Sequence, residues 1–182
     1  MKSYITIHME ENSFEQQIEL LKNEYYTQNK RTVFFRKTQK QDCAKVIENR
    51  LSFDVLCDKT IYMNELEDLP RVYVDYKIFK SFAQDSNYDF ILDKFRIVID
   101  KCVSKYGVYE ICADLGYLTI TGAHRYYSFI RTFCTQFLHD THVHKHLLQQ
   151  VFLYNYPAII PALKKLFYPF VPADVITKIV FV

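Results

Sequence analysis

Residues 151–182, which read VFLYNYPAIIPALKKLFYPFVPADVITKIVFV, decide the fold class of this chain. An apolar run typical of a strand ends at Asn155-Tyr156-Pro157, and a helical run follows until Tyr168-Pro169-Phe170. A second apolar run, Lys178 to Val182, comes last. Proline interrupts regular structure, and a strand, a helix and a second strand in this order form the crossover between parallel strands. The segment therefore predicts two parallel strands linked by a helix.

The same alternation of strand and helix patterns extends through the rest of the chain. Further strands are expected at Tyr4–Met9, Thr32–Phe35, Arg71–Tyr76 and Val108–Leu115. Further helices are expected from a capping box of Ser13 and Gln16 through Tyr25, and at Lys40–Leu56, Tyr88–Lys105 and Gly122–Leu138. This order predicts an α/β protein with a mostly parallel sheet, flanking helices and right-handed crossovers. We expect one domain, 1–182, in which residues 1–70 form an N-terminal α/β portion packed on a core of residues 71–182.

Composition indicates a soluble globular protein. Of the 182 residues, 49% are hydrophobic, which is enough for a substantial core, and the net charge is only +2. Acidic residues follow the first apolar stretch closely, and no apolar run is long enough to span a membrane, so we expect a cytoplasmic protein. The five cysteines are widely spaced and lie in apolar or helical patterns, which indicates reduced core residues.

The glycine content excludes the common nucleotide-binding loops. Only Gly107, Gly116 and Gly122 are present, and their spacing matches neither G-x-G-x-x-G nor G-x-x-x-x-G-K-[ST]. The G-x-S-x-G and H-E-x-x-H signatures are also missing. The sequence therefore predicts a non-enzymatic protein without a cofactor.

Short motifs in the second half of the chain carry a family resemblance. They are Asp114-Leu115-Gly116 after a predicted strand, Asn155 and Pro157 after another, Tyr168-Pro169-Phe170, and Thr177-Lys178-Ile179. In their order and spacing, residues from about Val72 to Val182 resemble the CRAL-TRIO lipid-binding fold. In its compactness the chain is most similar to the short, divergent branch that includes the BCH domains of GTPase regulators.

The resemblance implies a non-catalytic module that binds a phospholipid or another small hydrophobic ligand. Such a module could work at a membrane surface. By analogy with the fold, the apolar helix expected at Ala158–Phe167 would be a movable wall of the pocket. A buried tyrosine hydroxyl needs a polar partner, which makes Tyr126, Tyr127 and Tyr154 candidates for contact with a ligand. The full set of candidate ligand-binding residues is Tyr126, Tyr127, Phe133, Tyr154, Ile159, Leu163 and Phe167.

One departure from the family favours an alternative function. Longer lipid-transfer members continue past the last matched strand with elements that help to close the cavity, whereas this sequence ends at Val182. The alternative is a protein-interaction module without a ligand cavity, similar to the small-GTPase-binding BCH branch. Its partner would be a small GTPase or another protein.

The segment from His139 to His146 contains four histidines and offers a candidate metal site. On a helix His139, His142 and His146 share a face, whereas on a strand His142, His144 and His146 do. A metal-dependent enzyme would need His142 and His146 to converge with a carboxylate such as Asp114 or Asp140. The spacing does not specify such a site, so we expect a solvated polar surface and no metal.

Basic residues form a candidate surface for an acidic protein or an anionic membrane. Residues 116–182 contain six lysines and arginines but only two acidic residues, so this part of the chain is locally basic. No nucleic-acid-binding motif accompanies these charges, and nucleic acid is not an expected partner. The candidate surface residues are Arg36, Lys37, His142, His144, Lys145, His146, Lys164 and Lys165.

Overall fold

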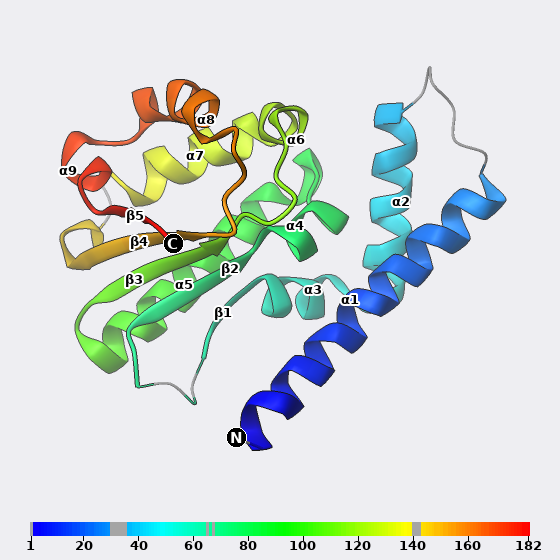
Figure 1. The fold of residues 1–182 in the computed structure, drawn as a ribbon, viewed down its shortest axis with the longest axis horizontal. Helices are drawn as coiled ribbons and strands as arrows, with labels where there is room; N and C mark the ends of the chain where they lie inside the picture. The colour runs from blue at the N-terminus through cyan, green and yellow to red at the C-terminus, as the bar shows by residue number, and fades with distance from the viewer. Residues whose placement is uncertain (1, 30–35, 65, 67, 140–142) are drawn as a thin grey trace.

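The computed structural model describes residues 2–29, 36–64, 66, 68–139 and 143–182, with side chains from Phe14 onward except that of Arg36 (Figure 1). The strands of these residues form one five-stranded sheet in the order β1-β2-β3-β4-β5. β1 (Ile61–Met63) runs antiparallel to β2 (Arg71–Asp75). β2, β3 (Tyr109–Asp114), β4 (Leu148–Tyr154) and β5 (Ile179–Phe181) are parallel. The expected α/β class with a mostly parallel sheet is confirmed.

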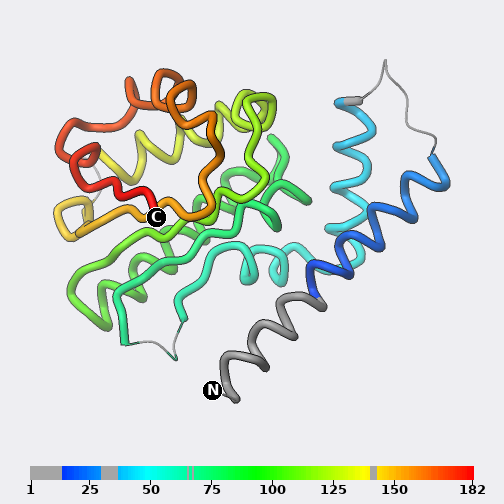
Figure 2. The backbone as a smooth tube through the Cα atoms, in the orientation of Figure 1, coloured from blue at the N-terminus to red at the C-terminus, as the bar shows by residue number. Residues whose placement is uncertain are grey.

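Helices precede the sheet and connect its parallel strands. Before the sheet lie α1 (Lys2–Gln28), α2 (Arg36–Leu51) and α3 (Phe53–Thr60). The connections contain α4 (Tyr76–Phe82), α5 (Tyr88–Tyr106), α6 (Ile120–Arg125), α7 (Tyr127–Phe137), α8 (Ile160–Phe167) and α9 (Ala173–Ile176). Short 3₁₀ turns lie at Asp85–Asn87, Lys145–Leu147 and Tyr168–Phe170. The paired helices α1 and α2 extend beyond the edge of the sheet (Figure 2).

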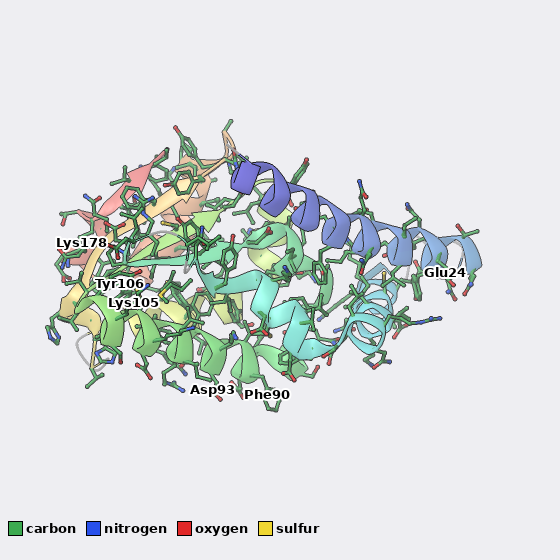
Figure 3. All side chains as sticks on the ribbon, turned by 90° about the horizontal axis from the view of Figure 1, so that it is seen from below. Glu24, Phe90, Asp93, Lys105, Tyr106 and Lys178 are labelled. Carbon is green, nitrogen blue, oxygen red and sulfur yellow. The ribbon has the colours of Figure 1, made fainter. Side chains whose placement is uncertain are left out.

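The two faces of the sheet differ in chemistry and in covering. On one face Val74, Ala113, Leu153 and Phe181 stand in register on neighbouring strands. Because the strands follow chain order and such crossovers are right-handed, the connecting helices lie on a single face. α5, which carries Phe90 and Asp93, lies along that side, while α1 lies on the other (Figure 3). Fully buried residues of the core include Phe82, Ile91, Ile99, Tyr109 and Leu148.

The N-terminal predictions were partly wrong. Tyr4–Met9 was expected to be a strand, but these residues belong to α1, so the helix does not begin at Ser13. A six-residue alternation is too short to override a helical pattern that continues directly from it. The strand expected at Thr32–Phe35 lies outside the described residues.

Two predicted helices are each divided in two. The pattern Lys40–Leu56 is interrupted at Ser52, whose φ of 66° places it in the left-handed region and separates α2 from α3. The pattern Gly122–Leu138 is interrupted at Tyr126, which lies between α6 and α7. Hydrophobic spacing continues across both interruptions, which explains why the sequence indicated single helices. β1 and α4 were not predicted.

Candidate functional site

An apolar cavity of about 260 Å³ lies between the sheet and the helices that cover it. Side chains of β2, β3, β4 and β5 form its floor, and α5, α7 and α8 contribute its walls. Most of the side chains that line it are aliphatic or aromatic. Interiors of natural proteins are close-packed, so a void of this size requires an explanation.

The floor of the cavity is a row of side chains set by the strand register. Val74, Ala113, Leu153 and Phe181 lie side by side across four parallel strands and point to the same face. Ala113, in the middle of this row, has the smallest side chain. Ala113 therefore leaves more space above the sheet than its neighbours in the row do.

Aromatic rings of α4, α5 and α7 form one wall. The ring centroids of Phe95 and Phe133 are 4.8 Å apart, and those of Phe79 and Phe129 are also 4.8 Å apart. The Tyr126 hydroxyl donates a hydrogen bond of 3.1 Å to the carbonyl oxygen of Lys80. Burial raises the pKa of Tyr126, so the hydroxyl stays protonated and its polar end is satisfied by the backbone.

The opposite wall is α8. Ile160, Leu163 and Phe167 follow helical spacing and line the cavity. Leu163 belongs to a small buried cluster with Leu118 and Ala123 that is separate from the main core. The buried residue of α8 therefore packs on α6 and the residue Leu118 before it, while the apolar side of the helix also borders the cavity.

Asp114 holds together the loops that follow β3 and β4. Its Oδ1 accepts a 2.7 Å hydrogen bond from the Gly116 amide, and its Oδ2 accepts a 2.9 Å hydrogen bond from Asn155 Nδ2. Asn155 and Tyr117 have φ values of 50° and 66°, which few residues other than glycine adopt. Two of the motifs that carry the family resemblance, Asp114-Leu115-Gly116 and Asn155 with Pro157, are therefore joined by a hydrogen bond at the carboxyl edge of the sheet.

Lys164 is the basic residue of the cavity lining. Its Nζ lies 4.5 Å from the ring centroid of Phe181 and 5.8 Å from that of Tyr168. These cation–π contacts hold the ammonium group beside two rings, those of Phe181 and Tyr168, that also line the cavity.

The predicted ligand-binding residues are divided among three places. Tyr126, Phe133, Leu163 and Phe167 line the cavity. Tyr127 stacks outside it on Phe167, with ring centroids 6.1 Å apart, and Ile159 packs beside the small cluster under α8. Tyr154 lies on the opposite face of the sheet, because neighbouring strand residues point in opposite directions and Leu153 faces the cavity.

Sequence reasoning missed the floor of the cavity. Ala113 and Phe181 were not among the candidates, although the strands that carry them were predicted. The missing information was the register between strands, which decides which residues share a face. Alternation along each strand gives only two possible sets, so a register would have identified this one.

The predicted basic residues do not form one surface. Lys37 and Lys165 are exposed on different helices, and His146 is exposed near the start of β4. His144 Nε2 lies 3.0 Å from Asp100 Oδ1, and Lys145 Nζ lies 2.6 Å from Asp174 Oδ2, a contact that lowers the pKa of Asp174. The side chain of Arg36 and all of His142 lie outside the described residues. Within the part of the chain that is described, no group of three or more His, Cys, Asp or Glu residues is arranged to hold a metal ion.

A larger hollow, of about 710 Å³, lies on the other face of the sheet beside α1 and α3. Its lining includes the carboxylates of Glu15, Asp58, Asp75 and Asp114 among tyrosines and apolar side chains. Glu15 forms an ion pair with Lys77. The abundance of carboxylates disfavours an apolar or anionic ligand there.

Comparisons with known proteins give one weak structural similarity. No family model and no curated protein matches its sequence. Among solved structures it is similar to the crystal structure of Sfh5, with a TM-score of 0.49 and 14% sequence identity. The similarity covers 67% of this chain and 47% of the Sfh5 chain, so this chain spans about half the length of that structure. No described helix has the length and apolar character needed to cross a membrane.

Proposed function

We propose that this protein binds a small hydrophobic ligand in the cavity under α8 and does not act on it chemically. The lining of the cavity carries the proposal: the apolar residues Ile160, Leu163 and Phe167 of α8 line one side of it, and apolar residues of the strands line its floor. Apolar cavities of this kind exclude water and accept apolar molecules. A ligand would add contacts between this helix and the strands.

The volume favours a slender ligand. Pockets for drug-sized molecules usually measure about 300–1,000 Å³, whereas this cavity measures about 260 Å³. An engineered cavity of about 150 Å³ holds benzene, with six carbons, so by proportion this one would hold about ten carbons. One alkyl chain fits this estimate, whereas a two-chain phospholipid would require α8 to move outward, as the resemblance to CRAL-TRIO proteins implies.

The chemistry of the wall favours binding over catalysis. The carboxylate of the lining, Asp114, already accepts hydrogen bonds from Gly116 and Asn155, which disfavours a role as general base. The thiol of Cys134 lines the cavity, but burial raises its pKa to about 12, so it stays protonated and weakly nucleophilic.

The first experiment combines native mass spectrometry of the purified protein with a binding titration. The chain has no tryptophan, so Phe167→Trp introduces a single reporter at the cavity wall. Titration of this variant with decanol should shift its tryptophan emission to shorter wavelength, saturably. Native mass spectrometry should reveal a copurifying apolar molecule that is released by organic extraction.

A cavity-filling variant makes the titration specific. Ala113→Leu, placed in the reporter background, should abolish the saturable shift while leaving thermal stability equal or higher, because it fills the void. Ala162→Leu is the matched control, since Ala162 is exposed on α8 and does not line the cavity. Saturable binding that survives Ala113→Leu would contradict the proposal. A protein with neither bound ligand nor titratable site would favour the protein-interaction alternative.

A further inference from the structure

We propose that the ligand is a single-chain amphiphile with an anionic head group, and that Lys164 binds this head at the rim of the cavity. This inference rests on the proposed function and specifies the ligand of the same site. The volume of the cavity limits the apolar part to one chain, and the charge at its rim selects the head.

Lys164 contacts aromatic rings, as Lys80 does, whereas several other lysines bind a carboxylate or a carbonyl oxygen. Lys145 pairs with Asp174, Lys77 pairs with Glu15, and Lys178 donates a 2.6 Å hydrogen bond to the carbonyl oxygen of Leu148. No carboxylate or carbonyl among the described residues accepts a hydrogen bond from Lys164, whose contacts there are the rings of Phe181 and Tyr168. A cation held at the mouth of an apolar cavity without an anionic partner is complementary to a negatively charged head.

The surroundings of Lys164 strengthen this complementarity. α8 contains Lys164 and Lys165 and no acidic residue. Asp114 also reaches the cavity lining, but it lies on β3, whereas Phe181 under Lys164 lies on β5. Two strand spacings of about 4.8 Å separate these strands, and both oxygens of Asp114 already accept hydrogen bonds. The head group therefore belongs on the β5 side of the mouth.

A neutral ligand would leave this arrangement unused, because an alcohol or a hydrocarbon offers no charge to the ammonium group. A carboxylate and a phosphate monoester present the same chemistry, a negatively charged oxygen that accepts from Lys164 Nζ. The experiment distinguishes these two sources with ligands that share one chain.

The test titrates the Phe167→Trp reporter protein with decanol, decanoate and decyl phosphate at low salt and mildly alkaline pH. Decanoate or decyl phosphate should bind about three- to tenfold more tightly than decanol, which is the range expected for a partly exposed charge-assisted contact. Lys164→Gln should remove this preference without changing the affinity for decanol. Lys164→Arg should restore it.

Lys165→Gln is the matched control, because it removes the same charge from the next residue of the same helix. Its preference for the anionic ligands should stay within twofold of that of the parent protein, and the thermal midpoints of all variants establish that they are folded. This inference is overturned, while the proposed function stands, if decanol binds and the two anionic ligands bind no more tightly than decanol does. It is also overturned if the higher affinity for the anionic ligands persists in Lys164→Gln. If none of the three ligands binds at the site that Ala113→Leu blocks, the proposed function fails and this inference fails with it.

Discussion

Two buried tyrosines of the protein differ in whether their hydroxyl group has a hydrogen-bond partner. Tyr109 at the start of β3 is fully buried, and its hydroxyl finds no hydrogen-bond partner among the described residues. Tyr126, also buried, directs its hydroxyl to the carbonyl oxygen of Lys80. The two tyrosines therefore make opposite contributions to stability at their hydroxyl groups, although burial raises the pKa of both.

Replacing these tyrosines by phenylalanine should separate the two cases. Tyr109→Phe removes an unsatisfied hydroxyl and should raise the free energy of unfolding by about 1 kcal/mol. Tyr126→Phe removes a hydrogen bond and leaves the Lys80 carbonyl without its donor, so it should lower the free energy of unfolding by about 1 kcal/mol. Urea denaturation of both variants and the parent protein measures these changes. A destabilised Tyr109→Phe variant would mean that the hydroxyl has a partner after all.

The sequence indicated some of the residues that line the cavity. Tyr126 lines the cavity, and the polar partner that its buried hydroxyl needs is a backbone carbonyl, which no side-chain pattern reveals. Tyr154 lies on the opposite face of the sheet, one position of alternation away from Leu153. Both residues stay predictions as ligand contacts.

The element that was hardest to predict is α4, which follows β2 without an intervening loop. Asp75 is the last residue of β2 and the N-cap of α4, where its Oδ1 accepts a 2.9 Å hydrogen bond from the Ile78 amide. α4 is only seven residues long, too short for hydrophobic spacing to identify. Burial is the largest of the effects that raise the pKa of Asp75, and the negative charges of Glu15 and Asp114 add to it.

The raised pKa of Asp75 makes its contribution to stability depend on pH. The folded protein holds the proton more strongly than the unfolded chain, whose aspartate pKa is about 3.9. The contribution is present below that pH and is lost as pH rises through the higher folded pKa. Asp75→Asn keeps the cap but cannot ionise, so the variant should gain stability relative to the parent across this window.

Urea denaturation at a series of pH values from strongly acidic to neutral measures this effect. The difference in unfolding free energy between Asp75→Asn and the parent should change in favour of the variant as pH rises and then become constant. A difference that is the same at every pH would show that the folded and unfolded pKa values of Asp75 are equal.

For the whole molecule, the sequence predicted the class of the sheet but not its cavity. The prolines and apolar runs of residues 151–182 correctly indicated β4, a helix and β5 as a parallel crossover. The cavity depends on where α8 lies, and Leu163 of α8 packs on Ala123 of α6 and on Leu118 before it. Leu163 is 40 or more positions from Leu118 and Ala123 in the sequence. Local sequence patterns therefore carry no information about the cavity beside this helix. The antiparallel pairing of β1 with β2 was missed because β1 has three residues.

The weak attachment of α8 leads to a prediction about its dynamics. α5 contributes the fully buried residues Ile91 and Ile99 to the main core, whereas Leu163 is the buried residue of α8. Elements with few buried contacts open locally at low cost, so in the free protein the amides of Ile160–Phe167 should exchange with solvent much faster than those of α5. A ligand in the cavity should slow the exchange of α8, because opening would require its release.

Hydrogen exchange followed by mass spectrometry tests this prediction, with decanoate at about ten times its dissociation constant. By mass action, decanoate at this concentration can slow the exchange of α8 by at most about tenfold. The exchange of α5 should slow by a smaller factor wherever its amides exchange without opening the cavity. In Ala113→Leu the added side chain occupies the cavity, so decanoate should leave the exchange of α8 unchanged. Protection of α8 in the free protein equal to that of α5 would mean that the helix is already firmly packed, and a movable wall would then be the wrong description of it.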